Sequence, residues 1–433
     1  MAWASSTGYE PDTDPEMIYY NASIINNRTV DTGGAALDPQ VYFNETRTTP
    51  LINDASKFFF SIVRFTINGP NLNMPMFIPQ IQIGQTDPDL TIYSITQDLS
   101  ATYFDASAGV SRHFDLSSGQ VYIEHIPERP LDAIPKPPVE TQEVANSRYY
   151  WISTYSHWLT CVNNAFATAQ ANLQTQLNAA WTAAGGVSPA PTITSQAPYI
   201  IRDPTANLFS LYADTYGYGG PDRTSAGSAT ADEDFTIYFN SNMWGLFANF
   251  ENYFLGGDLN QGREYQIVVK NVLGQNIGSQ ASPSSSPAPT TKYYIMTQDY
   301  QSTSTLWSPI SSIVFSTNMI PVIVEQQGDP LILGQSATGN INSGLGFSPI
   351  ITDIAVANEN ANGYREFLEY LPTAEYRLAS MGFSKVPIRT VDIRVFFKLR
   401  LTGELVPMSM FNLSSVDVKV LFRRRDFNIP SYR

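Results

Sequence analysis

The stretch TVDIRVFFKLRLTGELVPM, residues 390–408, alternates strictly between apolar and polar side chains. One face carries the apolar residues Val391, Ile393, Val395, Phe397, Leu399 and Leu401. The other face carries Asp392, Arg394, Phe396, Lys398 and Arg400. Successive side chains leave opposite faces of a pleated strand, so this period of two predicts a half-buried β-strand. Gly403, which follows Thr402, predicts a tight hairpin turn at its end.

The composition favours a surface that other protein covers. Only 15% of the 433 residues are charged, against roughly 25% in an ordinary soluble domain. Aromatic residues make up 12% of the chain, with 24 Tyr and 24 Phe. A chain of this length can bury a large core and form more than one compact unit. The shortage of charge therefore raises the expectation that the protein assembles with copies or partners.

The charge is spread unevenly along the chain. The whole chain has a formal charge of −14, but residues 380–433 hold ten cations and four anions, which gives +6 there and −20 elsewhere. The candidate contact residues in this basic part are Arg394, Lys398, Arg400, Arg423, Arg424, Arg425 and Arg433. Arginine clusters contact phosphates well, and they pair equally with acidic protein. The basic tail is thus expected to meet either the genome or a neighbouring subunit.

The N-terminus carries the complementary charge. Residues 1–35 read as an arm without apolar periodicity that orders against a partner. Its candidate contacts are Glu10, Asp12, Asp14 and Glu16. The arm has no basic region followed by an apolar core, so it does not read as a signal peptide. No run of about eighteen apolar residues predicts a membrane span.

Short β-type runs flank a different middle block. KFFFSIVRFTI (57–67) and LTIYSI (90–95) precede it, and SVDVKVLFRRR (415–425) follows it near the chain end. Proline-rich seams at 127–139 and 272–291 bracket the middle block. Inside it, residues 143–184 carry an apolar stripe at steps of three and four, which predicts a long amphipathic helix.

These patterns predict an all-β protein with a single jelly-roll sandwich. A large insertion domain, with one long helix and additional strands, interrupts the sandwich. The expected division is 1–35 as the arm, 36–130 as the first half of the jelly roll, 131–291 as the insertion domain and 292–433 as the second half with the basic C-terminal tail.

The chain offers no pattern of titratable residues that predicts catalysis or a cofactor. His113, His125 and His157 are the only histidines, and none has metal-ligand spacing. The carboxylates at 232–234 fit no calcium loop. Cys161 is the only cysteine, lies within the expected helix, and predicts a buried structural thiol in a protein that folds in a reducing compartment. We expect no catalytic residues, no metal and no cofactor.

Two regions resemble a known family of proteins. FFFSIVRFTINGPNLNMPMFIPQI (58–81) and LWSPISSIVFSTNMIPV (306–322) are followed by VPIRTVDIRVFFKLRLTGELVPMSM (386–410) and VKVLFRRR (418–425). In this order they resemble the penton, or minor capsid, proteins of polinton-like viruses and adintoviruses. Adenovirus penton bases are a more distant analogue. The Arg-Gly-Asp receptor tripeptide of some penton bases is absent here, so integrin binding is not carried over.

This resemblance implies a structural protein of the virion capsid of an icosahedral double-stranded DNA virus. Five copies would form a homopentameric vertex beside the major capsid protein, after synthesis and assembly inside the host cell. The insertion domain would face a vertex fibre or a receptor, and the basic tail would meet genomic DNA or protein. The alternatives are a viral fibre or lectin-like adhesive β protein, a major capsid protein, and a β-sandwich glycosidase that no motif supports. The size of the purified protein would separate them.

Overall fold

The computed structural model describes most of the chain. The described residues are 15–26, 40–68, 75–82, 84–127, 148–187, 189–218, 231–257, 261–269, 277–280, 291–299, 307, 309–323, 350–355, 367–370, 378–382, 385–400, 403, 405–410 and 414–425. The chain divides into two compact units. The first unit combines residues 1–74, 310–357 and 365–433, and the second combines 75–309 and 358–364.

Two antiparallel sheets form the first unit. The strands of one sheet are β1 (Met17–Asn26), β20 (Ser414–Arg424), β3 (Phe58–Asn68) and β16 (Phe367–Tyr370) in that order, with β17 (Ala379–Ser380) also paired to β3. The strands of the other are β15 (Ile350–Ala355), β14 (Ile310–Ser316), β18 (Thr390–Leu399) and β19 (Leu405–Pro407), with β2 (Tyr42–Thr46) also paired to β18. A short 3-10 turn, η1 (Ala55–Lys57), leads into β3.

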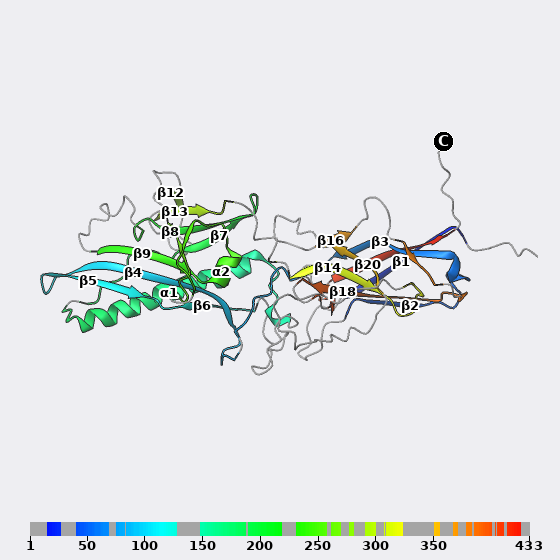
Figure 1. Ribbon diagram of the computed structural model, residues 1–433, viewed down its shortest axis with the longest axis horizontal. Helices are drawn as coiled ribbons and strands as arrows, with labels where there is room; N and C mark the ends of the chain where they lie inside the picture. Colours follow the sequence, from blue (N-terminus) through cyan, green and yellow to red (C-terminus); the bar gives the residue numbers. More distant parts are fainter. Residues whose placement is uncertain are drawn as a thin grey trace, which may run out of the picture. The chain divides into compact units, whose positions relative to one another are not determined.

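The two sheets pack face to face as a sandwich. The ring of Phe65 on β3 meets that of Phe315 on β14 edge-on at 4.9 Å. Within one sheet, Phe60 on β3 lies 5.0 Å from Phe422 on β20. Figure 1 shows β1, β20 and β3, which come from opposite ends of the sequence, side by side. The ends of the chain thus build one sandwich together.

The alternation of residues 390–399 is confirmed. Val391, Ile393, Val395, Phe397 and Leu399 are all buried, whereas Arg394, Phe396 and Lys398 are half-buried on the other face. The expected hairpin is also present, because β18 pairs with β19 from Phe396–Pro407 to Lys398–Leu405. Gly403 lies in that turn with φ +70°, the left-handed region that glycine adopts without strain.

The second unit holds two further sheets. The larger one runs β10 (Asn252–Phe254), β11 (Tyr265–Ile267), β9 (Ala231–Phe239), β4 (Leu90–Asp105) and β5 (Val110–Ser117), with β6 (Val121–Glu124) also paired to β4. The smaller one runs β12 (Ile277–Gln280), β13 (Thr291–Thr297), β8 (Leu208–Asp214) and β7 (Tyr199–Asp203). Its helices are η3 (Arg148–Tyr150), α1 (Tyr155–Ala183) and α2 (Ser241–Leu246).

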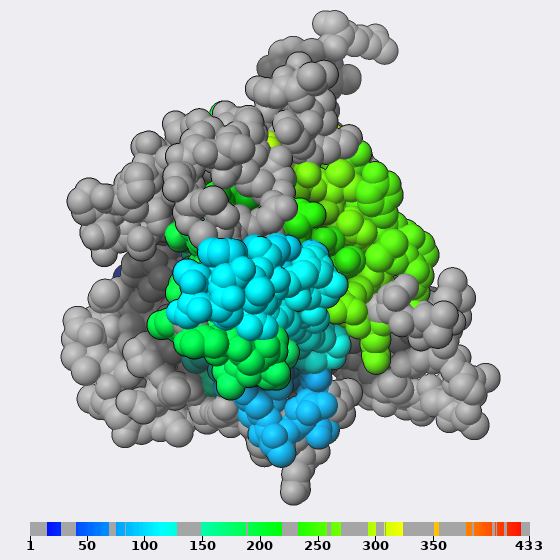
Figure 2. Space-filling view, turned by 90° about the vertical axis from the view of Figure 1, so that its left-hand side faces the viewer, coloured from blue at the N-terminus to red at the C-terminus, as the bar shows by residue number. Residues whose placement is uncertain are grey.

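The helix α1 forms where the apolar stripe predicts it, but it begins twelve residues later than expected. Thr154 ends the preceding extended segment, and its Oγ1 accepts a hydrogen bond from the backbone N–H of His157 at 3.2 Å. Such a cap satisfies one of the unpaired donors of the first turn. The stripe packs against β4, β5 and β6 of one sheet and β7 of the other. Figure 2 shows the C-terminal end of α1 against the β4–β5 hairpin, where Arg112 donates to the carbonyl of Gly185 at 3.0 Å.

The unit boundaries differ from the expected ones. The strands β4, β5 and β6, all within 36–130, belong to the sheet of the second unit rather than to the sandwich. The second unit therefore begins at residue 75, well before the expected insertion at 131. Alternation predicts that a segment is a strand but not which strand it pairs with, because partner choice depends on distant residues.

The buried thiol is confirmed, and one histidine is buried with it in the second unit. Cys161 is buried, which raises the pKa of its thiol and keeps it protonated. His125 is 1% exposed, and its Nε2 lies 3.1 Å from the carbonyl oxygen of Tyr149. Burial lowers the pKa of His125 to about 4. The folded state thus holds this imidazole neutral where an unfolded chain would protonate it.

This burial predicts that acid destabilises the second unit. Between pH 6.5 and about 4 the unfolded state binds a proton that folded His125 refuses, so stability falls as pH falls through that window, by about 3 kcal/mol in total. His125→Gln should remove this part of the pH dependence. Urea unfolding at pH 7 and pH 4, followed by tryptophan fluorescence, measures it. Five of the six tryptophans lie in residues 151–307, so the signal reports on this unit. The prediction would be contradicted if His125→Gln lost as much free energy of unfolding between pH 7 and pH 4 as the unmodified protein does. It would also be contradicted if the exposed control His113→Gln reduced that loss as much as His125→Gln.

Candidate assembly surface

The cationic side chains of β18 lie on the outer face of their sheet. The guanidinium of Arg394 stacks 4.9 Å above the ring of Tyr42, its cross-strand neighbour on β2. Lys398 is half-buried, and its carbonyl accepts a hydrogen bond from Ser311 Oγ at 3.2 Å. Arg400 follows the strand and is exposed. Stacking on an aromatic ring fixes the direction of a guanidinium and leaves its edge able to donate.

Asp392 does not belong to this cationic face, although the alternation placed it there. Its side chain is 0% exposed. The carboxylate accepts 2.6 Å and 2.8 Å hydrogen bonds from Thr317 Oγ1 and the N–H of Met319, and a third of 2.8 Å from the N–H of Asn318. β14 ends at Ser316, and the carboxylate of Asp392 accepts the hydrogen bonds of the turn that follows and holds that turn in place. A carboxylate with three donors is a structural anchor rather than a contact site.

The basic end of β20 meets the end of the acidic arm within one chain. The N–H of Arg424 donates to the carbonyl of Glu16 at 3.0 Å, and Met17 pairs with Arg423. The N–H of Arg425 donates to the carbonyl of Lys57 at 2.8 Å, and its guanidinium lies 5.2 Å above the ring of Phe59. The two charged ends are therefore neighbours in the same sheet. The remaining candidates Glu10, Asp12, Asp14 and Arg433 lie outside the described residues.

The structure does not bring all candidate cations together. Arg394 and Lys398 belong to the sheet of β18, whereas Arg423 and Arg424 belong to the sheet of β20. The two sheets of a sandwich turn their outer faces in opposite directions. Among the described residues, the cations thus form two separate groups.

The strand β1 forms a flank of the sandwich that sequence analysis did not anticipate. It lies within the expected arm, yet it pairs with β20 over all ten of its residues. Within the described chain no strand pairs with its other edge. Its outward side chains include Met17, Tyr19 at 50% exposure and Ile25 at 72%. The β-branched and aromatic run IYYNASII (18–25) was the available signal, hidden by the acidic residues before it.

The strand β2 completes this flank. The Tyr20 hydroxyl of β1 donates to the carboxylate of Glu45 on β2 and joins the two sheets at their edges. Burial, and then the bond to Glu45, raises the pKa of Tyr20 to about 12, so the hydroxyl stays a donor at neutral pH. Tyr42 of β2 is also exposed. We call this surface, made by β1 and β2, the β1 flank.

The opposite edges of both sheets form a second flank. There β16 and β17 border β3, and β15 borders β14. The N–H of Ile323 donates to the carbonyl of Ser380 on β17 at 2.7 Å, which places residues 319–323 along this edge. Met319 and Ile323 expose large apolar side chains here. We call this surface the β17 flank.

A metal site needs several donor side chains placed close together. Among the described residues, no group of three or more His, Cys, Asp or Glu side chains is placed to hold a metal ion. None of the helices in this part of the chain has the length and apolar character needed to cross a membrane. The exposed apolar side chains of the β1 flank and the β17 flank are the features of the first unit that favour contact with another protein.

Comparison with known proteins gives consistent matches. The family described as Sputnik minor capsid protein V18/19 matches residues 18–424. The uncharacterized protein V18 of the Sputnik virophage is 30% identical over 160 residues, which cover 36% of this chain and 83% of that protein. A chain of the Sputnik virophage structure matches with a TM-score of 0.65 and 24% identity, covering 95% of this chain and 98% of that one. The mavirus penton protein matches with a TM-score of 0.53 and 13% identity, covering 95% of this chain and all of that one. These structural similarities concern the fold, and they agree with the expected jelly roll with an insertion.

Proposed function

The chain belongs to the family of the Sputnik minor capsid protein V18/19 and is a structural protein of the virion capsid, and from that premise we propose that five copies close a ring at each vertex. The resemblance of the sequence to penton proteins and the similarity of the fold to the mavirus penton protein both support this proposal. The vertex would belong to an icosahedral double-stranded DNA virus, with the major capsid protein as its neighbour.

The two apolar flanks carry the proposal. A ring is built from a heterologous interface, in which one side of each subunit meets the opposite side of the next. The first unit exposes Met17, Tyr19 and Ile25 on the β1 flank, and Met319 and Ile323 on the β17 flank. These flanks lie at opposite edges of the same sandwich. A monomer that stayed alone would leave two apolar edges in water, whereas a ring covers both in every subunit.

The cations have separate roles in this proposal. The group on β18, Arg394 with Lys398, faces outward from one sheet. Arg423 and Arg424 lie at the end of β20 in the other sheet. Cations at the rim of an interface guide orientation and association rate more than they add affinity. We assign the β18 group to the neighbouring capsid protein. The segment after β20 is assigned to genomic DNA or to protein at the inner surface, and the second unit to a vertex fibre or a receptor.

Charged substitutions on either flank should break the ring without unfolding the subunit. Ile25→Asp and Met319→Asp each place a carboxylate where the ring would bury an apolar side chain, and both side chains are exposed in the single chain. We expect each to weaken subunit association by about a hundred-fold or more. Native mass spectrometry should show about 240 kDa, five times 48.0 kDa, for the unmodified protein and single chains for the variants. The control Val187→Asp changes a 70% exposed aliphatic residue of the second unit and should keep the pentamer.

Mixing the two variants tests the heterologous geometry itself. The β17 flank is unaltered in Ile25→Asp, and the β1 flank is unaltered in Met319→Asp. These two unaltered flanks can form one interface, so the mixture should form heterodimers of about 96 kDa, twice 48.0 kDa, and no closed ring. A trimer of the unmodified protein would favour the fibre, and a pseudo-hexameric assembly the major capsid protein. Ring formation by either variant, or no heterodimer in the mixture, would contradict the proposed interface.

A further inference from the structure

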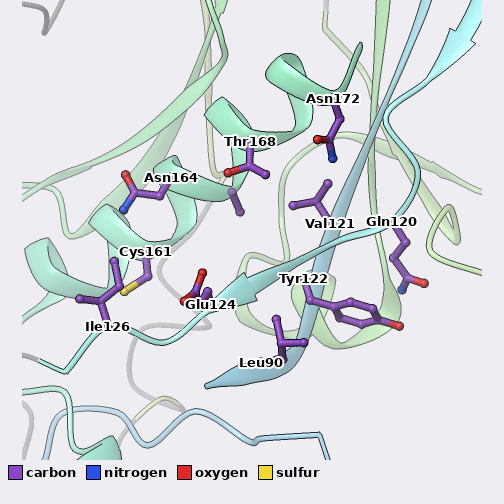
Figure 3. A pocket seen from close by; sticks show the side chains of 11 residues that line it. Leu90, Gln120, Val121, Tyr122, Glu124, Ile126, Cys161, Asn164, Thr168 and Asn172 are labelled. Atoms are coloured by element: carbon purple, nitrogen blue, oxygen red, sulfur yellow. The ribbon is translucent and has the colours of Figure 1, made fainter. Parts of the chain in front are cut away.

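The second unit contains a groove between the helix α1 and the strand β6. Its volume is about 360 Å³. The floor is formed by buried Val121, Cys161 and Ala165, and Glu124 and Tyr122 of β6 stand at one side. Figure 3 shows Asn164, Thr168 and Asn172 on successive turns of α1 on the other side, with Glu124 between the strand and the helix. All lining residues belong to the second unit, so the groove is independent of the flanks of the sandwich.

The helix side of the groove is uncharged. None of the 29 residues of α1 is Asp, Glu, Lys or Arg. Its exposed face consists of hydroxyl, amide and alanine side chains instead, including Asn164, Thr168 and Asn172. Covering a charged face requires the removal of water from ions, which costs far more than covering amides that find new hydrogen bonds. The face of α1 is therefore suited to being covered by another polar chain.

The strand side of the groove is a sheet edge. β6 pairs with β4 from Leu90–Glu124 to Ile95–Val121, and in the described part of the chain no strand pairs with its other edge. Consecutive residues 120–122 line the groove, although their side chains leave opposite faces of a strand. The groove thus borders the backbone edge of β6, where a further strand would find N–H and C=O groups.

Residues that face the groove repeat at similar distances along the helix α1 and along a strand. Residues four apart on a helix rise by about 6 Å, and residues two apart on a strand advance by about 6.7 Å. Alternate side chains of a strand laid along β6 would therefore meet Asn164, Thr168 and Asn172 in turn. Among the described residues that line the groove, Glu124 alone is charged, so it favours a cation on the incoming strand.

We propose that this groove binds an extended segment of another polypeptide, which adds a strand to β6 and places a Lys or Arg opposite Glu124. Main-chain hydrogen bonds to β6 supply the affinity, and the row Asn164, Thr168 and Asn172 selects small polar side chains at alternate positions. The groove lies in the second unit alone, so binding there does not depend on whether the sandwich forms a pentamer.

A phage-displayed library of eight-residue peptides tests the proposal on the full-length protein. The unmodified protein should enrich peptides with Lys or Arg between small polar residues, and Glu124→Arg should enrich peptides with Asp or Glu at that position. Thr168→Trp fills the groove and should enrich nothing, whereas Thr175→Trp, at another exposed position of α1 outside the groove, should behave as the unmodified protein does. Circular dichroism confirms that each variant is folded.

An N-methyl scan of the enriched peptide tests the binding mode. Strand addition uses alternate N–H groups, so methylation should weaken binding by about five-fold or more at every second position and little at the positions between. Equal enrichment on the unmodified protein and Thr168→Trp, an enriched charge that ignores Glu124→Arg, or an N-methyl pattern without a period of two would each overturn the proposal. The proposal would also be overturned if the protein enriched no peptide but bound neutral oligosaccharides on an array through this groove.

Discussion

Replacing Asp392 by alanine should lower the free energy of unfolding of the first unit by about 4 kcal/mol. The side chain is fully buried and accepts hydrogen bonds from Thr317 Oγ1 and from the N–H groups of Asn318 and Met319. Removal of the carboxylate leaves three donors without an acceptor in the protein interior. The turn at 317–320 would lose its anchor, and with it the position of Met319 on the β17 flank.

Hydrogen exchange of peptides from β14 and β18, followed by mass spectrometry, measures this loss. Exchange through unfolding should accelerate roughly a thousand-fold, which corresponds to about 4 kcal/mol. Asp417→Ala is the matched control, because Asp417 is half-buried on β20 and accepts from the exposed hydroxyl of Ser23. It should change stability by about 1 kcal/mol or less. Equal acceleration in the two variants would show that Asp392 is not an anchor.

Replacing Trp307 by alanine should lower the free energy of unfolding of the second unit by about 4 kcal/mol. Its indole Nε1 donates to the carbonyl of Leu246 at 3.0 Å. Its ring stacks on Phe209 at 5.0 Å and lies 5.3–5.4 Å from Phe247, Phe77 and Tyr155. The variant would open a cavity at the centre of this cluster and leave the Leu246 carbonyl without its donor.

Urea unfolding followed by the fluorescence of the remaining tryptophans measures the effect. Trp244→Ala serves as the control, because Trp244 is half-buried and stacks on Tyr265 at 4.9 Å near the surface. That change should cost no more than about 2 kcal/mol. If Trp244→Ala proved the more damaging of the two, Trp307 would not be the centre of the core.

Much of the local structure could be predicted because it depends on nearby residues. The alternation in 390–399 gave the correct buried face, and the stripe from Tyr155 to Trp181 gave the correct face of α1. The position of the helix start was less certain, because the cap at Thr154 competes with an apolar pattern that continues to Trp151. Patterning finds elements well and their ends poorly.

The remainder depends on contacts between distant residues. Asp392 reads as one member of a polar face, and its burial depends on a turn at 317–319, more than seventy residues away in sequence. The strands of 90–124 alternate like those of the sandwich, yet β4 pairs with β9 at 231–239, and β5 and β6 pair with β4. The arm contains β1 because β20, almost four hundred residues later, offers it an edge. Long-range pairing of this kind leaves no period in the sequence.

The central claim is that the sandwich forms five-fold rings at the vertices of the capsid, with the β1 flank of each subunit against the β17 flank of the next. A reconstruction of the assembled particle with icosahedral symmetry tests this most directly. We expect five copies of this chain around each five-fold axis, with Ile25 of one copy near Met319 of its neighbour. Density for the chain away from the five-fold axes, or a ring with either flank exposed to solvent, would contradict it.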